Sequence, residues 1–224
     1  MRVKASAAPV DDLLEGLFEE GVRGLASRLV YQPVDLLESE RALVARAVES
    51  RQREFSTGRV LARRLLEDLG YPPAPLLRDE DRVPSWPRGV VGSISHCRDL
   101  CVVAVAPEGT HAGIGLDVEL DAPSKDGIER IVCRPDERPW LDASIDGADR
   151  ARRVKLIFSV KEATYKAFYP EQRTFWSFQD VGVEVDLARD RFRAELPPGP
   201  EVTSIEGRVV RRGGWILSSV CRRR

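Results

Sequence analysis

The stretch Gly113-Ile114-Gly115-Leu116-Asp117-Val118-Glu119 predicts a β-strand with two different faces. Successive residues of a strand point to opposite sides, so the three branched apolar residues share one face and Gly115, Asp117 and Glu119 share the other. The glycines allow another backbone or a ligand to approach closely. Mg²⁺ takes oxygen ligands, commonly one or two carboxylates together with substrate phosphates. The stretch therefore predicts a metal-binding strand, although two such acids can also be ordinary surface residues.

A helix over residues 154–169 supplies the next charged groups. Its apolar residues follow one stripe at helical spacing, and a polar stripe runs beside it. Glu162 lies on the polar stripe and completes a set of three carboxylates with the strand. Glu162 and Lys166 are four residues apart, which also fits an ordinary surface ion pair. The functional alternative is that Lys161 and Lys166 neutralise phosphate charge.

The remaining pattern predicts helices, then strands, a helix and further strands. Helices are expected over residues 11–20, over 39–69 with Ser39 as N-cap and a break near Ser50, and over 127–133, the rest of 121–153 being mobile. Strands are expected over residues 90–95, 100–106, 181–187, 192–196, 202–210 and 215–221. This order favours an α+β fold with helices packed on antiparallel sheets.

The composition of the 224 residues is that of a globular protein, with 42% hydrophobic and 32% charged residues. A net charge of −1 gives no bulk reason to expect nucleic acid or an anionic membrane as partner. No apolar run has the length of a membrane span or a signal peptide, so we expect a cytoplasmic protein. We interpret the four cysteines as mostly buried free thiols rather than zinc ligands, and the ending Cys221–Arg224 as a frayed, solvated tail.

Several blocks together resemble one family. Gly92-Ser-Ile-Ser-His-Cys97, Gly113–Glu119 and Phe158-Ser-Val-Lys-Glu-Ala-Thr-Tyr-Lys-Ala167 are similar, in order and spacing, to the signature blocks of the Sfp/EntD-type 4′-phosphopantetheinyl transferases. The basic segment Arg51–Arg59 and the pair Trp86-Pro87 extend the resemblance, which covers roughly residues 36–170. A single block would be only weak evidence for the family. A lone histidine such as His96 is more often structural than a ligand contact.

The resemblance implies a pseudo-two-fold α+β protein whose two similar halves, residues 1–112 and 113–224, each hold a small antiparallel sheet and packed helices. Coenzyme A would lie in the cleft between them. The residues that the resemblance assigns to Mg²⁺, with Mn²⁺ as the alternative ion, are Asp117, Glu119 and Glu162. Those that it assigns to coenzyme A are Arg51, Arg59 and His96 around the 3′-phosphate, Arg78 and Ser95 in the nucleotide site, and Lys161 and Lys166 at the phosphates.

The implied reaction transfers the phosphopantetheine arm of coenzyme A to a serine of an apo acyl or peptidyl carrier protein and releases adenosine 3′,5′-bisphosphate. Glu162 would be the general base and Lys166 would stabilise charge on the transferring phosphate. The two-halved form suggests a monomer that serves secondary metabolism, through non-ribosomal peptide, siderophore or polyketide synthesis. Two alternatives stay open: an inactive module that binds coenzyme A, and a metal-dependent phosphohydrolase.

Overall fold

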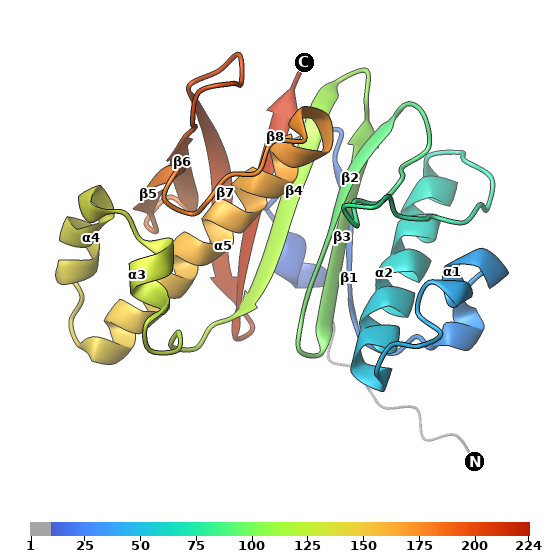
Figure 1. Cartoon of the computed structure of the whole chain (residues 1–224), viewed down its shortest axis with the longest axis horizontal. Coiled ribbons are helices and arrows are strands. Elements are labelled where there is room, and N and C mark those ends of the chain that lie inside the picture. The colour runs from blue at the N-terminus through green and yellow to red at the C-terminus, as the bar shows by residue number, and fades with distance from the viewer. Residues whose placement is uncertain (1–9) are drawn as a thin grey trace.

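Two antiparallel sheets form the centre of the protein in a computed structural model, which describes residues 10–224 (Figure 1). The first sheet has the strand order β1-β3-β2 and the second the order β4-β8-β7-β6-β5. Their strands are β1 (Arg23–Arg28), β2 (Val90–Cys97), β3 (Leu100–Pro107), β4 (His111–Leu120), β5 (Gly182–Asp186), β6 (Arg191–Glu195), β7 (Ser204–Arg212) and β8 (Trp215–Arg223). The expected α+β fold is confirmed.

Two long helices lie on the outer faces of these sheets. The α-helices are α1 (Glu38–Ala42), α2 (Glu49–Asp68), α3 (Ile128–Val132), α4 (Arg138–Asp142) and α5 (Gly147–Gln172), and three short 3₁₀ helices are η1 (Asp11–Leu14), η2 (Pro33–Asp35) and η3 (Pro135–Glu137). Helix α2 packs on the first sheet and α5 on the second, which gives the order helix, sheet, sheet, helix (Figure 1). Within residues 10–224, no helix is long and apolar enough to cross a bilayer.

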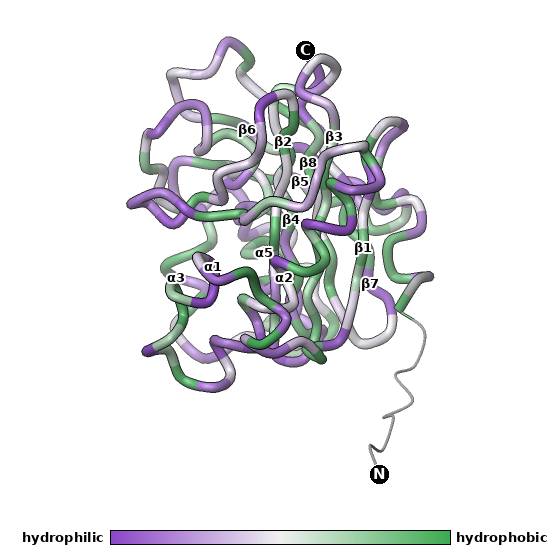
Figure 2. Tube along the Cα trace, turned by 90° about the vertical axis from the view of Figure 1, so that its right-hand side faces the viewer, coloured by the Kyte–Doolittle hydropathy of each residue, from purple (hydrophilic) through white to green (hydrophobic). Residues whose placement is uncertain are grey.

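Strand β3 is apolar throughout because it is covered on both faces. Leu100, Val102 and Ala104 belong to the core between the two sheets, which also contains Leu116 of β4. Val103, on the other face, packs with the leucines of α2. A strand that is buried on both sides reads as a continuous apolar run, as this one does. Along the chain, the hydrophobic stretches follow the central strands and the hydrophilic ones follow outlying loops (Figure 2).

The two sheets meet along the edge strands β2 and β4. The backbone N–H of Leu116 donates to Ser93 Oγ at 3.1 Å, and that of Val118 donates to Ser95 Oγ at 3.2 Å. These serine hydroxyls satisfy edge N–H groups that would otherwise be buried without a partner. The seam between β2 and β4 is thus joined through side chains, and it holds the blocks Gly92–Cys97 and Gly113–Glu119 in register.

Helix α5 lies almost against the backbone of β4. A Cβ atom added at Gly115 would be 1.7 Å from the carbonyl oxygen of Ala163, and one at Gly113 would be 2.3 Å from that of Ala167. Only glycine fits at these two positions, since real Cβ atoms do not approach a carbonyl so closely. The small residues on both elements therefore set the distance between the strand and the polar side chains of α5.

Several expectations about helix ends were wrong. The N-cap of α1 is Leu37 and not Ser39, because the Glu40 side chain accepts the Leu37 N–H at 3.1 Å. Helix α5 begins at Gly147, seven residues before the expected start at 154, because Asp146 caps it by accepting the Asp149 N–H at 2.7 Å. The segment 121–153 contains the expected short helix as α3, but also η3, α4 and the start of α5 where a mobile remainder was expected. Strand β1 was not expected either.

The basic C-terminus is not a frayed tail. Strand β8 continues to Arg223 and pairs with β4 along its length. Residues 222–224 form ion pairs with acids from other parts of the chain: Arg222 with Glu171, Arg223 with Glu19 and Arg224 with Glu108. Composition alone did not reveal these long-range partners.

Substitution of Gly115 by alanine should destabilise the protein by about 3 kcal/mol, because the new methyl group would overlap the Ala163 carbonyl and force α5 away from β4. Chemical denaturation of Gly115→Ala measures the loss. Gly109→Ala is the matched control, since no atom lies within 4 Å of a Cβ there. Equal stability of the two variants would contradict the close packing of α5 on β4.

Candidate functional site

Three carboxylates and two lysines meet where α5 crosses β4. Lys166 Nζ donates to Asp117 Oδ1 at 2.7 Å and lies 3.9 Å from Glu162 Oε2. Lys155 Nζ is 3.4 Å from Glu119 Oε2. Asp117 and Glu119 are adjacent same-face residues of β4, and the lysines and Glu162 come from the polar stripe of α5. The strand and helix patterns together therefore bring the expected acids to one place.

The carboxylates of this cluster are close enough for one to raise the pKa of another. Burial, together with the neighbouring Asp117, raises the pKa of Glu119. Burial also raises the pKa of Glu162, and the charges of Asp117 and Glu119 add to this effect. Burial opposes the charge of Lys166, but Asp117 and Glu162 outweigh it and raise the pKa of that ammonium group. Lys166 thus acts as the counter-ion at the centre of the carboxylates.

The donor chemistry of the cluster fits a hard divalent cation such as Mg²⁺. Asp117 Oδ2 is buried and has no hydrogen-bond partner among the described residues, so it is a free oxygen ligand. The side chains are not already arranged around a metal, because no group of three acidic, histidine or cysteine side chains within residues 10–224 has metal-holding geometry. Asp117, Glu119 and Glu162 would hold the cation once Lys166 turns aside.

A basic pocket lies on the other side of the β2–β4 seam, beside α2. Arg51 Nη1 is 2.7 Å from His96 Nε2 and 3.1 Å from Glu54 Oε2. Arg59 donates from Nε to the carbonyl oxygen of Leu76 at 2.6 Å. Burial, together with the charges of Arg78 and Arg51, lowers the pKa of Arg59 to about 10. The clustered arginines would be stabilised by an anion.

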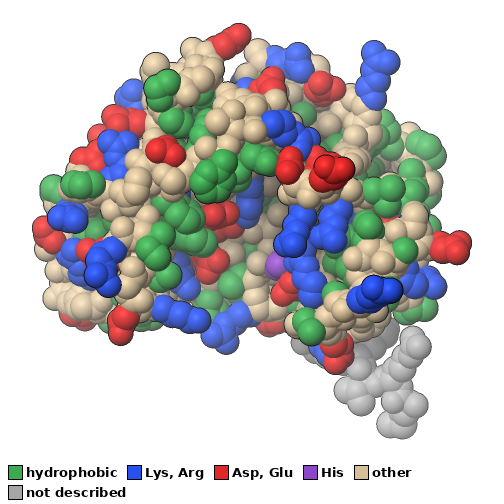
Figure 3. Space-filling model, in the orientation of Figure 1, with side chains coloured by type: hydrophobic (Ala, Val, Ile, Leu, Met, Phe, Trp, Pro, Cys, Tyr) green, Lys and Arg blue, Asp and Glu red, His purple; other side chains and the backbone are tan. Residues whose placement is uncertain are grey.

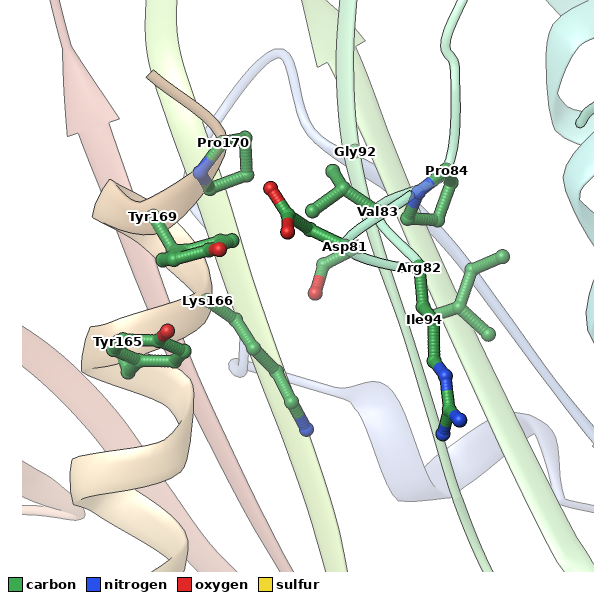
Figure 4. A pocket seen from close by; sticks show the side chains of 11 residues that line it. Asp81, Arg82, Val83, Pro84, Gly92, Ile94, Tyr165, Lys166, Tyr169 and Pro170 are labelled. Atoms are coloured by element: carbon green, nitrogen blue, oxygen red, sulfur yellow. The ribbon is translucent and has the colours of Figure 1, made fainter. Parts of the chain in front are cut away.

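These residues line a cavity of about 120 Å³, and a larger cavity of about 350 Å³ adjoins it. The larger cavity lies between the two halves and is lined by the turn 81–84 on one side and by Tyr165, Lys166 and Tyr169 of α5 on the other (Figure 4). On the surface, this region is a hollow with acidic side chains on its left and basic side chains on its right (Figure 3). The two signs of charge therefore face one cleft from opposite walls.

A third cavity of about 300 Å³ lies beyond Tyr165. Glu162 is one of its lining residues, and the others are mostly apolar or aromatic, including Phe175, Trp176 and Phe178. Its apolar lining suits an uncharged extension of a ligand rather than a phosphate.

The side chain of Lys161 does not point toward the cleft, where a phosphate contact was expected of it. Its side chain is 1% exposed, and Nζ donates to Val132 O at 2.8 Å, to Phe178 O at 2.9 Å and to Glu137 Oε2 at 3.0 Å. An ammonium group has three donors, so none remains for a phosphate. Lys161 faces the interior beside α3 and η3, and we correct its expected role from phosphate contact to structural ion pair.

The hydroxyl group of Ser95 is also occupied by hydrogen bonds within the protein. Its hydroxyl accepts from Val118 N–H, donates to Asp117 Oδ1 at 3.1 Å and is 3.4 Å from Lys166 Nζ. One donor and two acceptor positions are all that a hydroxyl has. Ser95 therefore orients Asp117 and Lys166, and its hydroxyl is not free for the nucleotide contact that the sequence suggested.

Three polar residues at the cleft were not in the expected site. Lys155 pairs with Glu119, Glu54 pairs with Arg51, and Arg82 lines both the small and the large cavity. The clustering of three of the five lysines between positions 155 and 166 was a signal for Lys155. Arg82 gave no such signal, because its location depends on how the turn around it folds.

Comparison with known proteins agrees with this geometry. Residues 39–106 match the family model described as the 4′-phosphopantetheinyl transferase N-terminal domain, and residues 113–210 match the 4′-phosphopantetheinyl transferase superfamily. The chain is 40% identical to 4′-phosphopantetheinyl transferase Svp of Streptomyces mobaraensis, over 84% of this chain and 79% of Svp. It is 34% identical to 4′-phosphopantetheinyl transferase Npt of Nocardia iowensis, over 93% of this chain and 99% of Npt. Enterobactin synthase component D of Salmonella typhimurium is 33% identical over 54% of this chain and 50% of its own length.

The carboxylate cluster on one side of the β2–β4 seam and the arginine pocket on the other are compatible with an enzyme that acts on a phosphorylated ligand. The chain belongs to the 4′-phosphopantetheinyl transferase superfamily, as the resemblance of its sequence blocks to the Sfp/EntD type implied, and is an enzyme of that class.

Lys161→Met should lower the free energy of unfolding by about 3 kcal/mol, because it leaves the Glu137 carboxylate buried without its partner. The affinity of the folded protein for coenzyme A should not change. Denaturation and calorimetric titration measure the two effects, and the exposed Lys125→Met is the control. A tenfold loss of coenzyme A affinity with unchanged stability would restore the phosphate-binding role.

Proposed function

We propose that this protein transfers the 4′-phosphopantetheine arm of coenzyme A to a serine hydroxyl of an apo carrier protein and releases adenosine 3′,5′-bisphosphate. The observation that carries the proposal is that Lys166, at the centre of the carboxylate cluster, lines the large cavity, and that the arginine pocket adjoins this cavity. Coenzyme A has phosphate charge at two separate places, a pyrophosphate and a 3′-phosphate. One wall suits a metal-bound pyrophosphate and the other a directly paired phosphate.

The halves of the protein would divide the ligand between them. We place their boundary near residue 112 and the active site in the cleft between residues 1–112 and 113–224. Arg51, Arg59, Arg78 and His96 of the first half would surround the 3′-phosphate. Asp117, Glu119 and Glu162 of the second half would hold Mg²⁺, which when bound supplies positive charge to the pyrophosphate oxygens. The apolar cavity beyond Tyr165 suits the uncharged pantetheine arm.

The chain's own residues would move the proton and stabilise the charge. A bond forms between the carrier serine oxygen and the phosphorus that bears the pantetheine arm, and the bond from that phosphorus to the bridging pyrophosphate oxygen breaks. Glu162 would accept the serine proton, directly or through water. Lys166 would leave Asp117 and stabilise charge on the transferring phosphate.

The partner would be an apo acyl or peptidyl carrier protein of secondary metabolism. One similar protein is enterobactin synthase component D, a name that points to siderophore synthesis, and non-ribosomal peptide and polyketide carriers are the other candidates. We further propose that the enzyme acts as a monomer, because residues of one chain line the large cavity, and that it acts in the cytoplasm.

Intact-mass spectrometry of an apo carrier protein tests the proposal. The carrier is incubated with the enzyme, coenzyme A and Mg²⁺, and a parallel sample contains EDTA. A mass gain of one phosphopantetheine arm, absent with EDTA, is expected. Coenzyme A binding without a gain on peptide, polyketide or fatty-acid carriers would contradict transfer and favour an inactive binding module. Release of phosphate without a carrier would favour a phosphohydrolase.

Asp117→Asn should lower turnover by about a hundredfold or more, since it removes a metal-binding charge that Lys166 and Ser95 orient. The fold should survive, because the amide keeps the shape of the side chain. Steady-state kinetics measures turnover and thermal melting measures stability, with the exposed Asp126→Asn as control. Wild-type turnover in Asp117→Asn would contradict the metal assignment.

Lys166→Met should lower kcat by about a hundredfold while changing the affinity for coenzyme A only a few-fold, because its charge is assigned to the transition state. The measurement compares kcat with coenzyme A binding by the same variant. Equal losses in both quantities would make Lys166 a binding residue instead.

A further inference from the structure

The turn between Arg78 and Pro84 has an unusual backbone at one arginine. Arg82 has φ of 67°, in the left-handed region that favours glycine. The turn is tightly bonded: Asp79 N–H donates to Val83 O at 3.0 Å, and Asp79 O accepts the Arg82 N–H at 3.0 Å. Strained residues that persist in a well-determined turn cluster at ligand clamps and active sites. Glycine would fit this position without strain, so the arginine side chain needs a reason.

The side chain of Arg82 lies where the two charged walls of the cleft meet. It lines both the arginine pocket and the larger cavity, a position that it shares, among the described residues, with Pro84 and Ile94. From opposite walls, Arg82 and Lys166 extend toward the same end of the cavity (Figure 4). Its guanidinium therefore borders both places at which a phosphate is expected.

Within residues 10–224, the charge of Arg82 is not compensated by a carboxylate. The two nearby acids of its own turn are directed elsewhere: Arg173 Nη1 is 2.5 Å from Asp79 Oδ2 and 3.2 Å from Asp81 Oδ2. Arg51, by contrast, has Glu54 as a partner. Arg82 is thus a free cation among other cations, an arrangement that an anionic ligand would stabilise.

The same acid pairs hold the turn in place over the cleft. Arg173 follows the end of α5, in the second half of the protein, whereas Asp79 and Asp81 belong to the first half. The turn therefore spans the two halves, with its acids toward α5 and its arginine toward the cavities. Because these ion pairs join the turn to the end of α5, the backbone of Arg82 is positioned beside the cleft, and its exposed side chain lines the cavities.

We propose that Arg82 is a further substrate-binding residue, whose guanidinium contacts a phosphate group of coenzyme A and whose strained backbone is retained for that contact. The inference rests on the proposed function. It accounts both for the choice of arginine at a left-handed position and for the absence of an internal partner.

Arg82→Gly separates binding from strain. The glycine removes the guanidinium and relieves the backbone, so the melting temperature should rise while the affinity for coenzyme A falls roughly tenfold. Arg82→Lys keeps a charge and should bind more tightly than Arg82→Gly. The matched control is Arg98→Gly, at the exposed β2–β3 turn, where φ is 52°. It should gain similar stability and keep wild-type affinity.

Calorimetric titration with coenzyme A and with 3′-dephospho-coenzyme A gives the answer. A loss seen only with coenzyme A assigns Arg82 to the 3′-phosphate, and an equal loss with both ligands assigns it to the pyrophosphate. Wild-type affinity of Arg82→Gly for both ligands would overturn the inference, as would an equal loss in Arg98→Gly. If the wild-type protein itself does not bind coenzyme A, the proposed function fails instead.

Discussion

The close approach of helix α5 to strand β4 is the constraint on which the site depends. A side chain at Gly113 or Gly115 would collide with the carbonyl groups of α5. Because both residues are glycine, the helix can lie directly against the strand backbone. The polar stripe of α5 is thereby brought directly over the carboxylate face of β4. Glu162 and Lys166 can then reach Asp117, and the buried packing fixes the separation of groups that an exposed loop would leave variable.

The seam between β2 and β4 connects this cluster to the first half of the protein. Ser93 and Ser95 replace a backbone ladder, and the Ser95 hydroxyl also binds Asp117. Strand β2 therefore presents Ser95 to Asp117 on one face and His96 to Arg51 of the arginine pocket on the other. In the structure, Lys166 compensates the buried carboxylates. We interpret it as the group that moves when a cation and a phosphate replace it.

The sequence predicted what depends on local pattern and short motifs. Alternation identified β4 and the C-terminal strands, helical spacing placed Glu162 and Lys166 together, and the ordered blocks indicated the family. Contacts between distant segments were not predictable. Lys161 is next to Glu162 in sequence, but its ammonium group lies in the interior, where it donates to the carbonyl groups of Val132 and Phe178. The partners of the C-terminal arginines lie far along the chain, and the left-handed backbone of Arg82 is set by its turn.

The central claim is that the carboxylates on β4 and α5 bind a divalent cation together with coenzyme A. Titration with Mn²⁺, followed by paramagnetic resonance in the presence of coenzyme A, tests this most directly. We expect the signal of free Mn²⁺ to decrease by the amount that corresponds to one bound ion per chain. Coenzyme A should strengthen this binding, and Asp117→Asn should abolish it. Coenzyme A binding with no change in the free Mn²⁺ signal would contradict the claim.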